Sequence, residues 1–279
     1  MADNYINSRL TKLLNTWSPL RLRKNLRAVV DEREQHAFSV RQLIAQRARL
    51  FELIEFAGRL SSFKDGGGDV SSVANQVRRT ESQFYQDIIG LLVAKGKRGG
   101  FFVEFGACDG VRISNTFVLE KEFGWSGILA EPGREWHADL KKNRACSIET
   151  QCVWSETGKK IPFYEAQGNH LESSADAGSM QINRAQSYEV ETISLCDLLK
   201  KYNAPHFIDF MSVDVEGAEF NILEPFPFDD YKFGIMCVEH HQSDEEERIK
   251  ALMKKNGYKQ IFRSISGFDG WYVPEQTEA

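Results

Sequence analysis

The pattern of apolar and polar positions changes along the 279-residue chain. Beyond residue 80, short apolar runs of strand length alternate with amphipathic stretches of helical periodicity. Strands that alternate with helices predict a doubly wound α/β fold, with a mostly parallel sheet and helices on both faces. The predicted strands are FFVEF (101–105), GILAE (127–131), SIETQCV (147–153), FIDFMSVDVE (207–216), FGIMCVEH (233–240) and two closing strands around a turn at 267–270.

The first 80 residues have a different pattern, which predicts three parts for the chain. Residues 1–60 are expected to form an α-helical extension, in which Ser18 and Pro19 suit an N-cap and a first helical position. Residues 61–80 are expected to be a Gly/Ser-rich linker, because three consecutive glycines resist regular structure. The α/β domain then occupies residues 81–279.

The net charge of −5 is unevenly distributed. Residues 1–50 contain ten Lys/Arg and four Asp/Glu, so the excess of acidic residues lies in the α/β domain. A basic extension suits a membrane surface, an anionic glycan or a partner protein, although a solvated helix face is the plainer interpretation. Its helices could also pack on a second copy of the chain. The acidic domain argues against nucleic acid as a partner.

Nothing in the sequence suggests a membrane or secreted protein. No apolar run approaches the roughly 20 residues of a membrane-spanning helix, and the N-terminus lacks the apolar core of a signal peptide. The cysteines are scattered without a CxxC pair, which is typical of reduced thiols in a cytoplasmic protein. They are Cys108, Cys146, Cys152, Cys196 and Cys237.

Polar residues follow four of the predicted strands at their carboxyl ends. In a doubly wound sheet the ligand crevice lies beyond these ends. Any one of the acids alone would suit a helix cap or a solvated turn, but their coincidence at four strand ends favours a ligand site. The residues are Glu104 with Asp109, Glu131, Asp214 with Glu216, and Glu239 with His240.

The loop after the first strand, FGACDG, differs from the GxGxxG loop of dinucleotide-binding folds. An acidic loop repels a pyrophosphate and suits a ligand that carries an amine and a sulfonium. Glu131 follows Gly110 by 21 residues at the end of the next strand, where an acid can accept hydrogen bonds from ribose hydroxyls. Together these features indicate S-adenosylmethionine.

Several ordered motifs, spread over about residues 80–275, resemble the FkbM-type S-adenosylmethionine-dependent methyltransferase family. The resemblance implies the class I methyltransferase Rossmann-like fold, with a seven-stranded, mostly parallel sheet and a reversed strand near the end. Members methylate hydroxyl groups, often on sugars of surface glycans or on natural products. The motifs are SQFYQD (82–87), GGFFVEFGACDGVRISNTFVLEKEFGWSGILAEP (99–132), the pair at 143–144, YEVETISLCDLL (188–199), IDFMSVDVEGAEFNILEPFPF (208–228) and VEHH (238–241).

The resemblance assigns cofactor-binding roles to residues of these motifs. Glu104 would act on the methionine amine, and Glu131 would hold the ribose. Ser114 and Asn115 would open the next helix, whose N–H groups can hold the methionine carboxylate, although Ser114 also suits a plain helix cap. Cys108 stands where the family usually has Asn, and we expect it to be a buried, inert thiol. The remaining loop residues are Gly106, Ala107, Asp109 and Gly110.

Methylation of a hydroxyl needs help with the proton, because a sugar hydroxyl is a poor acid. In one model His240 is the base and Asp214 or Glu216 orients it. In the other, Asp214, Glu239 and His240 hold a divalent cation that lowers the pKa of the hydroxyl. We favour the base without a metal. Trp271 and Tyr272, near the last turn, are the candidates for stacking on a sugar.

The sequence therefore predicts an S-adenosylmethionine-dependent O-methyltransferase. Its acceptor would be a hydroxyl on a sugar of a surface glycan, a nucleotide sugar or a glycosylated natural product. An alternative is a catalytically idle methyltransferase-like scaffold in a glycan-biosynthesis complex, which would be expected to lack the cofactor acids that are present here. Methylation of a nucleic acid base is disfavoured, because VDVEG (213–217) stands where such enzymes usually carry an Asp/Asn-Pro-Pro-aromatic sequence.

Overall fold

Seven strands form the main sheet, in the order β3-β2-β1-β7-β8-β10-β9. The structure is a computed structural model, and it describes residues 79–166, 184–240, 244–263 and 268–277 with the single residues 73, 76 and 175. All neighbouring strands are parallel except β10, which is antiparallel to β8 and β9, so the mostly parallel sheet with a reversed strand is confirmed. The strands are β1 (Phe101–Phe105), β2 (Ser126–Ala130), β3 (Ser147–Glu149), β7 (Phe207–Val213), β8 (Lys232–Glu239), β9 (Tyr258–Ile261) and β10 (Asp269–Pro274).

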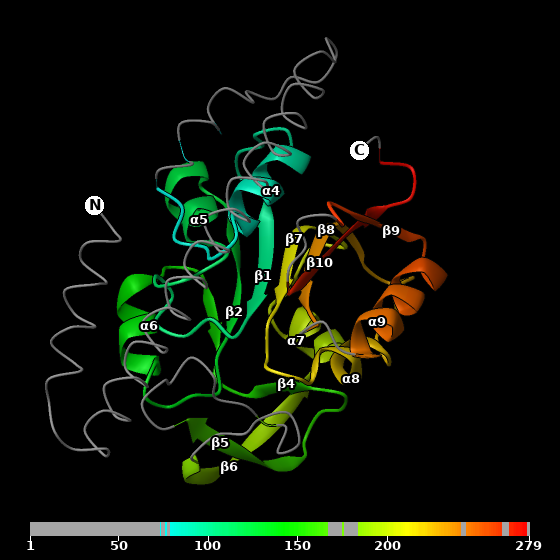
Figure 1. Cartoon of the computed structure of the whole chain (residues 1–279). Coiled ribbons are helices and arrows are strands. Elements are labelled where there is room, and N and C mark those ends of the chain that lie inside the picture. The colour runs from blue at the N-terminus through cyan, green and yellow to red at the C-terminus, as the bar shows by residue number, and fades with distance from the viewer. Residues whose placement is uncertain are drawn as a thin grey trace, which may run out of the picture. The chain divides into compact units, whose positions relative to one another are not determined.

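Helices cover both faces of the main sheet (Figure 1). Successive strand residues point to opposite faces, so each strand serves two apolar layers. In β1, Phe102 packs with α4, α5 and α6, whereas Val103 packs with α7, α8 and α9. The helices are α4 (Gln86–Val93), α5 (Phe117–Phe123), α6 (His137–Asn143), α7 (Leu195–Lys201), α8 (Glu219–Leu223) and α9 (Asp244–Lys255).

The central strand β7 carries one charged residue, Asp209, within an otherwise buried run. Its carboxylate accepts hydrogen bonds from Lys97 Nζ at 2.8 and 2.9 Å and from the backbone N–H of Phe101 at 2.9 Å. A buried carboxylate is tolerated when it is paired in this way, and here it ties the start of β1 to β7. The acid is therefore part of the scaffold.

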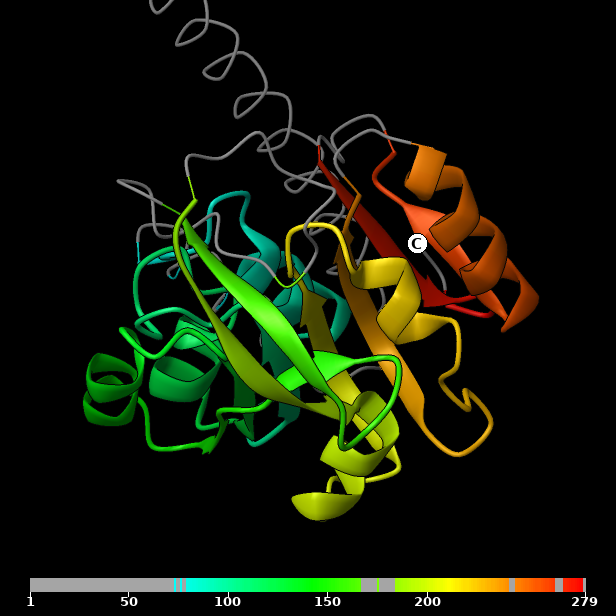
Figure 2. The same cartoon turned by 90° about the horizontal axis from the view of Figure 1, so that it is seen from below.

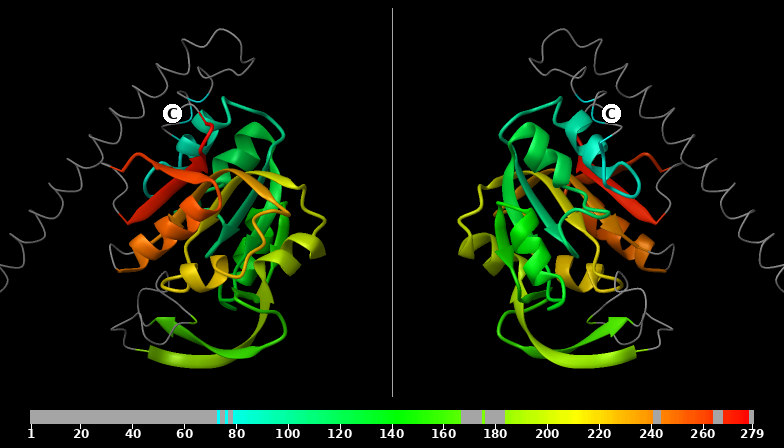
Figure 3. Two further views of the ribbon diagram at one scale, coloured as in Figure 1. Left: turned by 90° about the vertical axis from the view of Figure 1, so that its right-hand side faces the viewer. Right: turned by 90° about the vertical axis from the view of Figure 1, so that its left-hand side faces the viewer.

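A second, three-stranded sheet was not predicted from the sequence. The run at 147–153 breaks into β3 and β4 (Cys152–Trp154), and β4 joins β6 (Arg184–Ser194) and β5 (Lys160–Ala166) in the order β4-β6-β5. The break has a physical cause, because Glu149 Oε1 accepts hydrogen bonds from the N–H groups of Thr150 and Gln151 and turns the chain there. The β5–β6 ribbon lies apart from the main sheet (Figures 2 and 3).

The two aromatic residues expected to stack on a sugar lie in the core instead. Trp271 and Tyr272 are both fully buried in β10. Trp271 packs with the α4 side of the sheet and Tyr272 with the α9 side. The expectation for both residues was wrong, because β10 is an interior strand of the sheet and both of its faces are covered.

The predicted helical extension over residues 1–60 lies outside the described residues, as does most of the predicted linker over 61–80. The expected contacts of the extension therefore remain predictions.

Candidate functional site

The loops that follow β1, β2 and β7 meet at the carboxyl edge, meaning the edge of the main sheet at which β1, β2, β7 and β8 end. Gly106 lies at the meeting point with φ 72°, and its N–H donates to the carbonyl of Ala130 at 3.1 Å. A Cβ atom at this position would overlap the carbonyl oxygen of Asp214. Only glycine fits here, and the order of strands reverses at this same point, between β1 and β7.

Glu104 is buried at the end of β1, and both of its carboxylate oxygens are occupied by donors from the chain. Oε1 accepts from the N–H of Asn115 at 2.7 Å, and Oε2 accepts from the hydroxyls of Ser114, at 3.1 Å, and Thr116. Burial raises the pKa of Glu104, against the opposing effects of Arg144 and these hydrogen bonds. This environment favours a structural role for Glu104, which anchors the loop over 106–116.

Arg144 and Asn143 hold the same loop from α6, and sequence reasoning assigned them no role. The Arg144 side chain is buried and donates to Glu120 Oε2 at 2.7 Å and to the carbonyl of Gly110 at 2.9 Å. Its Nη1 also lies 3.9 Å from Glu104 Oε2. Asn143 Nδ2 donates to the carbonyl of Asp109 at 2.9 Å. The only indication in the sequence was the presence of this pair among the family motifs.

The remaining loop residues shape the backbone. Asp109 Oδ1 accepts from the N–H groups of Val111 and Arg112, which forms a local turn. Ala107 is buried, and Gly110 has φ 76°, where a Cβ atom would come within 2.6 Å of Arg144 Cγ. Cys108 is buried with φ 46°, and burial raises the pKa of its thiol well above its usual range. The expectation of a buried thiol is confirmed, and the raised pKa agrees with an inert one.

Ser114 and Asn115 do not open the next helix as expected. Helix α5 begins at Phe117 after Thr116, so both residues lie in the loop, where they donate hydrogen bonds to Glu104. Asn115 Nδ2 also donates to Ser212 Oγ at 2.9 Å, which links the loop to β7. Asn115 Oδ1 is buried and has no hydrogen-bond partner in the part of the chain that is described. It is therefore an acceptor that a ligand could use.

Glu131 follows β2 and is buried beside the same loop. Its two oxygens accept from the N–H groups of Cys108 at 2.8 Å and Gly133 at 2.6 Å. Burial raises the pKa of Glu131 to about 7, against the effect of these hydrogen bonds. Each carboxylate oxygen can accept a second hydrogen bond, so the residue is still able to hold a ribose as predicted.

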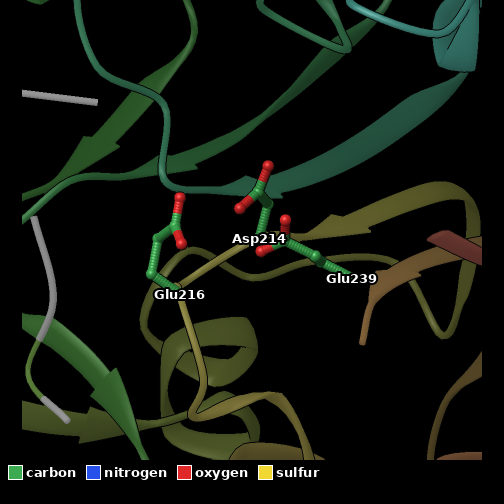
Figure 4. A group of neighbouring side chains, drawn as sticks. All are labelled: Asp214, Glu216 and Glu239. Atoms are coloured by element: carbon green, nitrogen blue, oxygen red, sulfur yellow. The ribbon is translucent and has the colours of Figure 1, made fainter. Parts of the chain in front are cut away.

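Three carboxylates come together at the ends of β7 and β8 (Figure 4). Asp214 follows β7 directly, Glu216 lies two residues further on with φ 60°, and Glu239 is the last residue of β8. Their ligand oxygens lie within 4.8 Å of one another. Burial and the charges of Glu239 and Glu216 raise the pKa of Asp214 well above its usual range. We call these three residues the carboxylate cluster.

His240 is not part of this cluster, although it was expected both as the base and as a metal ligand. Its side chain is 1% exposed, and its backbone N–H donates to the carbonyl of Phe268 at 2.8 Å. Among the described residues, the group that could hold a cation contains Glu216 in the place predicted for His240. His240 is therefore absent from the group that could hold a cation, whereas its role as the base stays a prediction.

A comparison with known protein families identifies the family to which this chain belongs. Residues 104–260, more than half of the chain, match the family model described as the methyltransferase FkbM domain. The chain belongs to the FkbM methyltransferase family. This family identity confirms the resemblance and implies S-adenosylmethionine as the cofactor. None of the curated proteins matches the chain.

Solved structures similar to this FkbM-family chain include other methyltransferases. Precorrin-6y C5,15-methyltransferase from Geobacter metallireducens is 10% identical, with a TM-score of 0.38, and the match covers 67% of this chain and 85% of that one. A methyltransferase from Pyrococcus furiosus is 14% identical, with a TM-score of 0.34 and coverage of 82% and 96%. Phosphoethanolamine N-methyltransferase 2 from Haemonchus contortus, in complex with S-adenosylhomocysteine, is 12% identical, with a TM-score of 0.31 and coverage of 64% and 40%. Similarities this low say nothing about the acceptor.

The residues of the carboxyl edge fit the cofactor that the FkbM family implies. Asn115 Oδ1 is a buried acceptor available to an ammonium group, and Glu131 retains lone pairs for hydroxyls. Asp214 adds negative charge next to Gly106, which suits a cationic ligand. The carboxylate cluster supplies only oxygen ligands, which magnesium, calcium and manganese prefer over His-containing sets. Across the described residues, no helix is long and apolar enough to cross a membrane.

Proposed function

We propose that the chain transfers the methyl group of S-adenosylmethionine to a hydroxyl oxygen of a sugar. The observation that supports this most directly is the carboxylate cluster, which lies at the carboxyl edge beside the loop over 106–116. A hydroxyl must lose its proton as it is methylated, and a carboxylate whose pKa is raised, as that of Asp214 is by burial and by its acidic neighbours, is suited to accept that proton. The choice of a sugar as the acceptor rests on the resemblance to the FkbM family.

The chain's own residues would bind the cofactor from three sides. Asn115 Oδ1 would accept a hydrogen bond from the ammonium group, and Glu131 would accept from the ribose hydroxyls. Gly106 keeps the backbone close to β7 without a side chain in the way. The bound cofactor supplies a methyl group that is already activated on a sulfonium. Alignment of the two reactants can then contribute up to about 7–11 kcal/mol of the barrier reduction.

Asp214 would act as the base. As the acceptor oxygen bonds to the methyl carbon, the bond from sulfur to that carbon would break and S-adenosylhomocysteine would leave, while the O–H bond breaks and the proton passes to the carboxylate of Asp214. Glu239 lies close enough to share that proton, since the oxygens of the cluster are within 4.8 Å. Base catalysis of this kind contributes about 10²–10⁴-fold.

A divalent cation on the same three carboxylates is the second way to handle the proton. It would lower the pKa of the hydroxyl and neutralise the repulsion within the cluster. An assay after dialysis against EDTA separates the two. Full activity without added cation supports Asp214 as the base, whereas activity restored by Mg²⁺ or Mn²⁺ alone supports the cation.

The proposal is tested with purified full-length protein and S-adenosylmethionine that carries a deuterated methyl group. Acceptors are offered as separate sets of sugars, nucleotide sugars, phenols, amines and peptides, and products are identified by mass spectrometry and NMR. We expect the label on an oxygen of a sugar. Label on nitrogen or carbon, or on a phenol alone, would reject the proposed acceptor. S-adenosylmethionine that binds without turnover in any set would favour the idle scaffold.

A further inference from the structure

The segment over 80–87 crosses the carboxyl edge from the loop after β1 to the start of β10. Ser82 forms a parallel bridge with Ile113 at one end. At the other end, the buried Gln86 Nε2 donates to Asp269 Oδ2 at 2.9 Å. Asp269 pairs with Glu239 across β8 and β10, so the segment reaches the carboxylate cluster. This segment includes the SQFYQD motif, to which the proposed function assigns no role.

Asp87 holds the segment in one conformation. It is fully buried, and its Oδ1 accepts from the hydroxyls of Thr80 at 2.6 Å and Ser82 at 2.8 Å and from the N–H of Ile88 at 2.8 Å. Tyr85 adopts φ 62°, which is strained for a non-glycine residue and must be enforced by these contacts. The segment is therefore a wall of fixed shape at the carboxyl edge.

This wall presents an aromatic pair. The rings of Phe84 and Phe268 lie 6.4 Å apart at an interplanar angle of 39°. Phe268 is 46% exposed, and among the described residues only Phe207, at 50%, is a comparably exposed large apolar side chain. The backbone of Phe268 is anchored at the carboxyl edge. Its carbonyl accepts a hydrogen bond from the backbone N–H of His240, and the next residue, Asp269, accepts one from Gln86. An exposed aromatic ring whose backbone is anchored next to Asp269 and His240 suits ligand contact.

We propose that Phe84 and Phe268 form the acceptor subsite and stack against the ring of a pyranose. The inference rests on the proposed function, which it narrows. A pyranose ring has an apolar C–H face, which suits an aromatic surface, and hydroxyls at its rim, which suit carboxylate acceptors. Phe84 and Phe268 offer the first, and Asp269, Glu239 and Asp214 offer the second in the same region.

The acidic residues near the subsite narrow the class of acceptor sugar further. The oxygens of Asp214, Glu216 and Glu239 lie within 4.8 Å of one another, and Asp269 lies opposite Glu239 on the neighbouring strand. A negative charge on the acceptor would be repelled by this group of acids. The subsite therefore favours a neutral sugar or an amino sugar over a uronic acid or a sugar phosphate.

The test uses the full chain, S-adenosylhomocysteine or S-adenosylmethionine, and a panel of methyl pyranosides that includes glucoside, mannoside, rhamnoside, glucosaminide and glucuronide. Binding is followed by saturation-transfer NMR, and turnover by release of S-adenosylhomocysteine. Phe268→Ala and the Phe84→Ala/Phe268→Ala double variant are expected to raise KM for the best pyranoside about tenfold or more. The Kd for S-adenosylhomocysteine stays unchanged. The glucuronide is expected to be the weakest ligand.

The matched control is Phe207→Ala, which removes an equally exposed phenylalanine from the start of β7 and should leave KM unchanged. Wild-type turnover of a pyranoside with the same KM in Phe268→Ala and Phe207→Ala overturns the subsite and leaves the proposed function standing. Absence of both saturation transfer and turnover across the whole panel rejects the sugar acceptor itself. Preference for the glucuronide over the neutral glycosides overturns the charge argument.

Discussion

Two sets of carboxylates lie at the same edge of the main sheet, and their surroundings differ. On the β1–β2 side, Glu104 and Glu131 each accept hydrogen bonds from at least two donors of the chain. On the β7–β8 side, Asp214, Glu216 and Glu239 bring their oxygens within 4.8 Å of one another. The first set stabilises the loop that it holds, whereas the second set repels itself.

This difference distinguishes carboxylates that support the fold from carboxylates that are available for proton transfer. A buried carboxylate that is fully hydrogen-bonded fixes the chain around it and has little capacity left for a reaction. Carboxylates that face one another repel one another, and among the three the pKa of Asp214 is raised by burial and by the charges of Glu239 and Glu216, which suits a group that takes up a proton. We therefore expect substitutions on the first side to change stability most and substitutions on the second side to change activity most.

The largest effect is expected for Arg144→Met, which removes the cation that faces Glu104 and Glu120 and keeps most of the apolar length. Loss of one partner from a buried charge network typically destabilises a fold by about 3–5 kcal/mol. Urea unfolding would measure this. Adding Glu104→Gln should recover part of the loss, because the neutral amide no longer leaves a charge buried.

The control for this experiment is Arg79→Met. Arg79 pairs with Glu122 at 2.9 Å, but its side chain is 62% exposed. Removing an exposed pair should change stability by less than about 1 kcal/mol. Equal losses in the Arg144 and Arg79 variants would show that the loop does not depend on the buried network.

The next effect is expected for Asp214→Asn, which should lower kcat by about 10²–10⁴-fold. The same change should stabilise the protein by about 1 kcal/mol or more, because it removes a group whose pKa is raised by burial and by Glu239. Calorimetry should show that S-adenosylmethionine binds as before. Glu224→Gln, an exposed position, is the matched control and should change neither property. An Asp214→Asn variant with full activity would remove Asp214 as the base.

The sequence predicted the sheet better than the contacts that fill its carboxyl edge. The strand over 101–105 and the acids at the strand ends follow from apolar runs and their boundaries, which are local features of the chain. The partners of Glu104 come from residues 114–116 and from Arg144, and no local pattern specifies which donors reach a given carboxylate.

The cation group contains Glu216 in the place predicted for His240, and this difference has a similar cause. Adjacent residues at the end of a strand point to opposite sides, so His240 does not lie on the side where Glu239 meets Asp214. The turn after β7, with φ 60° at Glu216, supplies the third carboxylate. The second sheet was missed because the turn at Glu149 depends on hydrogen bonds to its own side chain, within an otherwise strand-like run. Each of these features depends on a single contact that composition does not reveal.

A smaller effect is expected from pH in the absence of ligand. Burial raises the pKa of Glu219 from 4.5 to about 7, chiefly by desolvation and also through the charge of Glu239. Between these values the folded state binds more protons than the unfolded state, so stability is full below about pH 4.5 and is lost as the pH rises through 7. The loss for such a group is roughly 3 kcal/mol.

Thermal unfolding followed from about pH 5 to about pH 8 would measure this slope. Glu219→Gln should flatten it, because the amide does not titrate. Glu224→Gln again serves as the control, since it removes an exposed carboxylate. A slope that is the same in both variants would mean that Glu219 is not responsible for the pH dependence.

The smallest effect is expected for Cys108→Asn, on the side of the paired carboxylates. Cys108 has φ 46°, a left-handed conformation that asparagine adopts several-fold more readily than most residues. Its backbone N–H donates to Glu131 and would be kept. We expect a gain of about 0.5–1 kcal/mol, which corresponds to a rise in Tm of roughly 1–4 °C for a domain of this size. Cys108→Ser is the control, because it keeps the size of the side chain without the preference of asparagine for this conformation. If the asparagine variant is no more stable than the serine variant, the backbone conformation does not select the residue, and the thiol is kept at position 108 for its packing.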